Sequence, residues 1–127
     1  MSKLMIALIV TAGLSLAGPG VAQITSTLMS KDSYTMAKKN ADAQYKRDKE
    51  ACSALSGNAK DICVAEAKGK HNVATAEAEA AFKNTPKARE GARIAHAEAS
   101  YDVAIEKCDD LAGNRKDVCV NSNERSS

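Results

Sequence analysis

Cysteine is the residue type in this chain with the widest chemistry, because its thiolate attacks disulfides, binds metals and forms cross-links. The chain has four cysteines, and they form two pairs with identical spacing, Cys52 with Cys63 and Cys108 with Cys119. This C-x10-C spacing differs from the C-x-x-C of redox enzymes and is a poor match to zinc-binding spacings. The pattern therefore favours structural disulfides, and a thiol-based redox or metal-binding role is the alternative.

Other residues with catalytic chemistry are few and scattered. His71 and His96 are the only histidines, and neither lies near a cysteine in the sequence. We interpret both as surface residues, and the acidic pair Asp109-Asp110 as the solvated end of a helix. The sequence contains no C-x-x-C-H haem site, no G-x-S-x-G, no phosphate loop and no H-E-x-x-H. We therefore expect no catalytic residue, no metal site and no cofactor, and we predict that the protein is not an enzyme.

Composition excludes nucleic acid as a partner. The chain has 127 residues, with 18 Lys and Arg against 16 Asp and Glu, a formal net charge of +2. A nucleic-acid-binding domain of this size shows a basic face or stripe. Aromatic residues make up 3% of the chain and Trp is absent, so there is almost nothing on which bases could stack. The length allows one small domain.

The first 22 residues have the pattern of a signal peptide. Lys3 gives a basic start, residues 4–16 form an apolar run, and Gly18-Pro19-Gly20 breaks any helix before a small residue at Ala22. The apolar run is shorter than the roughly 20 residues of a membrane-spanning helix, although an uncleaved anchor is the alternative. Cleavage after Ala22 leaves a chain without a transmembrane span. We therefore expect a periplasmic or secreted protein, in which disulfides persist.

The sequence contains an internal repeat with an offset of 56 residues. Residues 51–64 and 107–120 align without gaps, and identical residues stand at eight of the positions. Such self-similarity indicates that one supersecondary unit is used twice. The matching pairs are Cys52/Cys108, Leu55/Leu111, Gly57/Gly113, Asn58/Asn114, Lys60/Lys116, Asp61/Asp117, Cys63/Cys119 and Val64/Val120.

Each copy of the unit predicts a tight corner between two antiparallel helices. Leu55 would end the first helix, and Gly57 would follow it at the C′ position, where a positive φ is needed. Asn58 would cap the next helix, with Asp61 three residues later as in a capping box. A connection this short makes the two helices antiparallel neighbours. The second corner repeats this pattern with Gly113, Asn114 and Asp117.

This corner geometry predicts which cysteines pair. Cys52 lies in the last turn of one helix and Cys63 in the second turn of the next, so their Cα atoms come within the usual 4.4–6.8 Å or so of a disulfide. Locality and the repeat favour Cys52 with Cys63 and Cys108 with Cys119 over the two other pairings of four cysteines. Closing a loop of about 12 residues stabilises the fold by roughly 3 kcal/mol.

Between the corners the sequence predicts an all-α fold of antiparallel helical hairpins, with three long helices and a short fourth. Ala, Lys and Glu dominate, and Gly and Pro rarely interrupt. Thr85 would cap the third helix, with Pro86 at its first position. The helical domain would span residues 31–124, after a flexible segment at 23–30 and before a tail at 125–127. The four helices are expected near residues 31–56, 59–83, 86–112 and 115–124.

The apolar faces of these helices are thin. Leu, Ile, Val and Phe supply only 13 of residues 23–127. Helix seams built on Ala permit close approach but bury little area, which contributes about 25 cal/mol per Å². We therefore expect the disulfides to be needed for folding, as in other small exported scaffolds. Self-association through the Ala seams is a second way of adding buried area.

The repeated unit C-x-x-L-x-G-N-x-K-D-x-C-V, at Cys52–Val64 and Cys108–Val120, resembles a motif of small Ala/Lys-rich exported proteins of Gram-negative bacteria. The resemblance implies a helical periplasmic protein and no catalytic activity. We therefore predict a non-enzymatic scaffold or interaction protein, whose partner is another protein or a cell-envelope component. The basic pairs Lys38-Lys39 and Lys46-Arg47 would face any anionic envelope surface, although neighbouring acids weaken their field. The alternative function is a thiol-based redox or metal-binding stress protein of the periplasm.

Overall fold

The computed structural model describes residues 28–126 and contains four helices. They are α1 (Lys31–Cys52), α2 (Gly57–Lys83), α3 (Pro86–Cys108) and α4 (Asn114–Glu124). No strand occurs within the described residues, so the predicted all-α fold with three long helices and a short fourth is confirmed. The predicted signal peptide and most of the segment at 23–30 lie outside the described residues.

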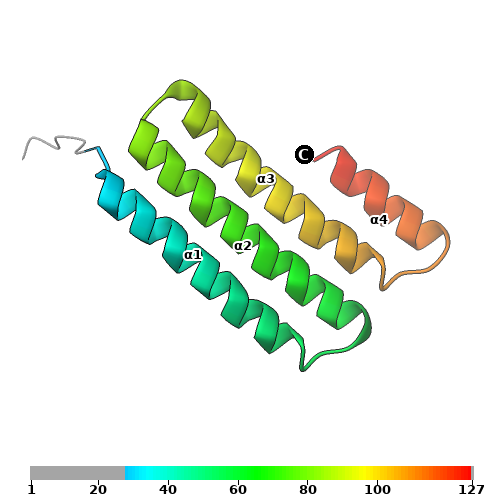
Figure 1. Ribbon diagram of the computed structural model, residues 1–127. Helices are drawn as coiled ribbons and strands as arrows, with labels where there is room; N and C mark the ends of the chain where they lie inside the picture. The colour runs from blue at the N-terminus through cyan, green and yellow to red at the C-terminus, as the bar shows by residue number, and fades with distance from the viewer. Residues whose placement is uncertain (1–27, 127) are drawn as a thin grey trace, which may run out of the picture.

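The helices form a single layer in which each is antiparallel to the next (Figure 1). α2 packs between α1 and α3, and α4 packs on the other side of α3. No other pair of helices is in contact within residues 28–126. One layer of helices has two broad faces, and neither is covered by a further element of the described chain. None of these helices combines the length and the apolar character that crossing a membrane requires.

Side-chain and backbone caps explain where the long helices begin and end. The Ser30 hydroxyl accepts a hydrogen bond from the backbone N–H of Ser33, 3.1 Å away, at the start of α1. Thr85 does the same for the N–H of Ala88, with Pro86 at the first position of α3, as predicted. α2 ends at Lys83, and its C-cap residue Asn84 has a φ of 49°, which reverses the chain between the two helices.

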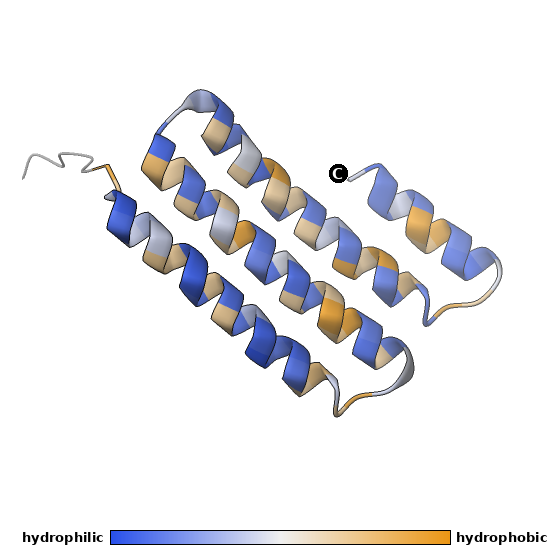
Figure 2. Ribbon diagram, viewed as in Figure 1, coloured by the Kyte–Doolittle hydropathy of each residue, from blue (hydrophilic) through white to orange (hydrophobic). Residues whose placement is uncertain are grey.

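The core is small and is built from small residues. The buried apolar residues are Ala41, Cys52, Ala67, Ala78, Ala95 and Cys108. α2 and α3 approach closely at Gly69, where an added Cβ would lie only 2.8 Å from the Cβ of Ala99. Figure 2 shows the most apolar residues in short separate patches on α2, α3 and α4, with α1 mainly hydrophilic. Such packing buries little apolar area, because each contact involves few carbon atoms.

Two predicted helix ends are wrong. The first and third helices were expected to reach residues 56 and 112, but α1 ends at Cys52 and α3 at Cys108. In the first corner the N–H groups of Ser53, Ala54 and Leu55 each bond to the carbonyl three residues earlier. The last turn therefore tightens and unwinds from the helix directly after the cysteine. Leu55 consequently lies in the connection and is 44% exposed.

Candidate functional site

Each corner is closed by a disulfide, and the predicted pairing is confirmed. Cys52 is bonded to Cys63 with 5.6 Å between their Cα atoms, and Cys108 to Cys119 with 5.7 Å. All four cysteines of the chain are therefore paired. Cys52 and Cys108 are fully buried. Their partners Cys63 and Cys119 are half-buried, so each disulfide joins an enclosed cysteine to a partly exposed one.

A glycine with a positive φ stands in each corner. Gly57 and Gly113 both have a φ of 58°, and Gly113 has a ψ of −142°, a region that only glycine occupies without strain. An added Cβ at either position would meet no atom within 4 Å, so backbone conformation and not space requires glycine. The predicted place within the corner is wrong, because Gly113 is the N-cap of α4 and does not follow directly on α3.

The predicted caps by asparagine and aspartate are also wrong. No side chain caps the start of α2 or of α4. Asn58 is the second residue of α2, two positions after the N-cap Ser56, and Asn114 is the first residue of α4, one position after the N-cap Gly113. Asp61 is the fifth residue of α2 and lies past the first turn, whereas Asp117 lies within the first turn of α4, where the helix dipole favours a negative charge.

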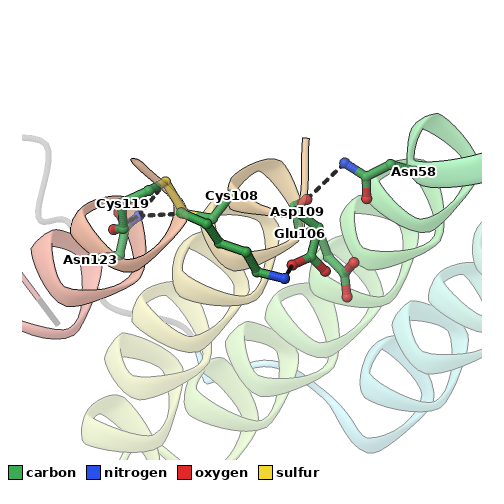
Figure 3. A network of polar contacts seen from close by, with 7 residues as sticks. Asn58, Glu106, Cys108, Asp109, Cys119 and Asn123 are labelled. Atoms are coloured by element: carbon green, nitrogen blue, oxygen red, sulfur yellow. Dashed lines mark hydrogen bonds and ion pairs between the residues drawn. A yellow bond between two sulfur atoms is a disulfide. The ribbon is translucent and has the colours of Figure 1, made fainter. Parts of the chain in front are cut away.

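Asn58 instead joins the two hairpins. Its side-chain Nδ2 donates a hydrogen bond of 2.9 Å to the backbone carbonyl of Glu106, near the end of α3 (Figure 3). The Glu106 carbonyl also accepts from the backbone N–H of Asp109 at 3.1 Å, so the Asn58 side chain is its second donor. Asn114 stands at the same position of the second copy, and its side chain makes no hydrogen bond within residues 28–126.

The second corner has polar contacts of its own, which Figure 3 also shows. Lys116 Nζ lies 2.7 Å from Asp109 Oδ1, so an ion pair joins α4 to the end of α3. This hydrogen bond, together with the charge attraction, raises the pKa of the Lys116 ammonium. Asn123 Nδ2 donates to the carbonyl of Cys119 at 3.0 Å and lies 3.5 Å from the sulfur of Cys108. In the first corner Ser53 replaces Asp109, and its hydroxyl donates to the carbonyl of Glu50.

Both histidines contact a carboxylate on a neighbouring helix, which the sequence analysis did not find. His71 Nε2 on α2 lies 2.7 Å from Asp42 Oδ1 on α1, and its ring lies 5.1 Å from the ring of Tyr45. His96 Nε2 on α3 lies 2.7 Å from Glu77 Oε1 on α2. Each pair bridges two helices at the surface and involves only one acid. No cluster of three or more His, Cys, Asp or Glu side chains suited to a metal ion occurs in the described part of the chain.

A shallow groove of about 400 Å³ runs between α2 and α3 beside the two corners. Asp61 and Lys68 line it from α2, and Tyr101, Asp102 and Glu106 line it from α3. The groove is open to solvent along its length. Its lining combines apolar residues such as Val64 and Ile105 with these charged ones.

Comparison with known proteins gives no relative for this chain. No family model matches it, and neither does any curated protein or solved structure. Its function is therefore argued from the corners and from the faces of the helices.

Proposed function

We propose that the protein is an exported, periplasmic or secreted scaffold that acts by contact with other molecules and catalyses no reaction. The observation that carries this proposal is the pair of disulfides, which close both corners and use every cysteine in the chain. Disulfides of this kind persist in oxidising compartments and are rare in the cytosol. The pattern of residues 1–22 supports the same location.

The thin core supports a structural role for the disulfides. Only small residues and half-cystines are buried among the apolar positions, so hydrophobic burial alone stabilises the hairpins weakly. Each disulfide closes a short loop and adds roughly 3 kcal/mol through the unfolded state. Small exported domains commonly combine a limited core with such cross-links.

The broad surface of the layer supports a function in binding. Both faces of a single layer of helices are open to contact, and they carry mixed charges with isolated apolar residues. Among the exposed large apolar residues are Leu28, Met36, Leu55, Ile94 and Val118. Single exposed apolar residues are normal on a protein surface. A single layer of helices, however, exposes a large area for its size, and that area is open to contact with a partner. The proposed partner is another protein or a component of the cell envelope.

The proposal is tested by expressing the full chain in a Gram-negative host beside a matched variant that lacks residues 1–22. We expect the full chain in the periplasmic or secreted fraction, with the mass of residues 23–127 and both disulfides formed. The variant should remain in the cytosol, reduced and with little helical circular dichroism. A full chain that stays in the cytosol, or a reduced variant that is fully helical, would overturn the proposal.

A second measurement separates the scaffold from the redox or metal-binding alternative. The exported protein is reduced, mixed with zinc or copper ions, dialysed and analysed for bound metal beside a Cys52→Ser, Cys63→Ser variant. We expect no stoichiometric metal in either sample. If the reduced protein binds stoichiometric metal and the variant does not, the cysteines are a metal site, and the metal-binding alternative replaces the scaffold.

A further inference from the structure

The sequence repeat relates α3 to α1 and α4 to α2, with the same offset of 56 residues. Within the chain, the two hairpins meet where α2 packs on α3. The corresponding faces are the outer face of α4 and the outer face of α1, and no described element covers either (Figure 1). We propose that α4 of one copy packs on α1 of a second copy as α2 packs on α3, so that copies add head to tail. This inference rests on the proposed function as an interaction scaffold.

The first observation concerns Asn58, which joins the two hairpins within the chain, and its repeat counterpart Asn114. Asn58 donates from its side chain to the carbonyl of Glu106 and so ties the start of α2 to the end of α3. The residues at the corresponding positions are Asn114 and Glu50. Asn114 is exposed and caps no helix. A second copy would place Asn114 beside the end of α1, where the Glu50 carbonyl already accepts from the N–H and the hydroxyl of Ser53, so Asn114 would bond to it in place of the Ser53 hydroxyl.

The second observation is an apolar residue on the outer face of α4. Ile62 lies on α2 at helical spacing from Asn58 and Gly69, on the side that meets α3, and it is half-buried. Its counterpart Val118 is 55% exposed. On the other side of the contact, Ala99 packs closely on α2, and its counterpart is the equally small Ala43 on α1. The α4–α1 contact would therefore cover Val118 with a face that permits close approach.

The third observation is charge complementarity. In the groove between α2 and α3, Lys68 of α2 and Asp102 of α3 carry opposite charges. At the proposed contact, Asp117 of α4 is the counterpart of Asp61, and Lys46 of α1 is the counterpart of Asp102, so opposite charges again lie on the two sides. Complementary charges of this kind set the register and exclude wrong partners.

The geometry also defines the size and symmetry of the contact. Neighbouring helices alternate in direction, and α1 of a second copy would continue this alternation beside α4. The 11 residues of α4 span about 16 Å, so they cover only the half of α1 nearest its corner. Such a contact buries less than the roughly 1,200–2,000 Å² of stable complexes, so we expect weak association. Because the two faces differ, the contact is heterologous and leads to open arrays.

The test is sedimentation of the oxidised exported protein from about 10 μM to about 1 mM, the range of weak contacts. We expect the average mass to rise with concentration. Val118→Asp should lower the association constant at least about tenfold, because it places a charge at the contact. Asn114→Ala should lower it by about threefold or less, because the Asn114 bond would replace the one that the Ser53 hydroxyl makes within the chain. Ile94→Asp is the matched control, since Ile94 is 47% exposed on α3 and lies outside the contact.

Cross-linking of a mixture of light and heavy isotope-labelled protein identifies the faces. A carbodiimide should join Lys46 to Asp117 in peptides that combine both labels. A mass that stays monomeric throughout, cross-links found only within one chain, or equal effects of Val118→Asp and Ile94→Asp would each overturn the inference. Circular dichroism of each variant checks that it is folded. If fractionation still places a monomeric protein in the envelope with both disulfides, the proposed function stands and only this inference fails.

Discussion

The two corners of the molecule have almost the same sequence but different surroundings. In both, the disulfide spans a sequence separation of 11 residues and the glycine has a φ of 58°. The first corner joins helices of 22 and 27 residues, and α2 also packs on α3. The second corner holds a helix of 11 residues that touches only α3. The comparison shows that local sequence determines the shape of a corner, whereas neighbouring helices determine how much of the fold depends on it.

Removing each disulfide should give the largest effects and should separate the two corners. The double substitution Cys52→Ser, Cys63→Ser should lower the free energy of unfolding of the whole domain by about 3 kcal/mol. The substitution Cys108→Ser, Cys119→Ser should instead melt α4 alone, because an isolated helix of this length is marginal in water. Thermal unfolding followed by circular dichroism measures both. Equal losses in melting temperature would contradict the inference that more of the fold depends on the first corner than on the second.

The corner glycines should come next in size. Gly57→Val forces a β-branched residue to a φ of 58°, and we expect a loss of about 1–3 kcal/mol in unfolding free energy. Ala59→Val is the matched control within the same helix and should cost less than about 1 kcal/mol. Gly113→Val should affect only the helical signal of α4. Chemical denaturation of the three variants would refute the corner geometry if Gly57→Val and Ala59→Val were equally stable.

The junction between the two hairpins should be sensitive to a single methyl group. Gly69→Ala places a Cβ 2.8 Å from that of Ala99, and we expect a net loss of about 1–2 kcal/mol. Gly91 on α3 has no neighbour within 4 Å of an added Cβ. Gly91→Ala should therefore stabilise the protein by about 0.5–1 kcal/mol through helix propensity alone. Urea denaturation should therefore show opposite changes in unfolding free energy for the two variants. A stabilising Gly69→Ala would show that the helices do not approach this closely.

The repeated asparagines should respond differently in dilute solution. Asn58→Ala removes the hydrogen bond to Glu106 and should lower the unfolding free energy by about 1 kcal/mol. Asn114→Ala removes no hydrogen bond within the described chain and should change stability by less than about 0.5 kcal/mol. Both variants insert the same residue at the same repeat position, so each is the control for the other. Equal losses of unfolding free energy at micromolar protein concentration would show that the two asparagines do not differ in their contacts within the chain.

The ion pair of the second corner should give the smallest effect. The pKa of Lys116 is raised by its hydrogen bond to Asp109, so its stabilising contribution is complete below the ordinary lysine pKa of 10.5. That contribution is lost as the pH rises through the higher folded value. Asp109→Ser makes this corner like the first, and we expect a slight fall in melting temperature at neutral pH that disappears in strong alkali. The side chain of Lys116 is 45% exposed, and solvent weakens such an ion pair, so a large change at neutral pH would contradict this assignment.

Much of the fold could be predicted from the sequence because its signals are local. The paired cysteines, the Thr85 cap and the antiparallel corners each depend on residues within about 12 positions of one another. The ends of α1 and α3 were misplaced because Leu55 and Leu111 resemble the last apolar residues of a helix. In the structure the residues that follow Cys52 and Cys108 form the connection to the next helix, so they are not helical.

The contacts that were missed are those between helices. The bond from Asn58 to Glu106 joins residues 48 positions apart, and the local capping pattern pointed to a different role. The pair of His71 with Asp42 spans 29 positions, and that of His96 with Glu77 spans 19. No short spacing in the sequence marks such pairs, since they arise only when the helices are laid side by side. The repeat was the one long-range signal, and it relates equivalent positions without showing what they touch.

Both disulfides join cysteines that are consecutive in the chain, which has a consequence for how the protein is made. If the chain is exported from its N-terminus, as we propose, Cys52 and Cys63 emerge before Cys108. The first bridge then forms while no wrong thiol is available, and the second follows in the same way. Oxidation in order of emergence therefore leads directly to the native pairing, and maturation should not depend on disulfide reshuffling.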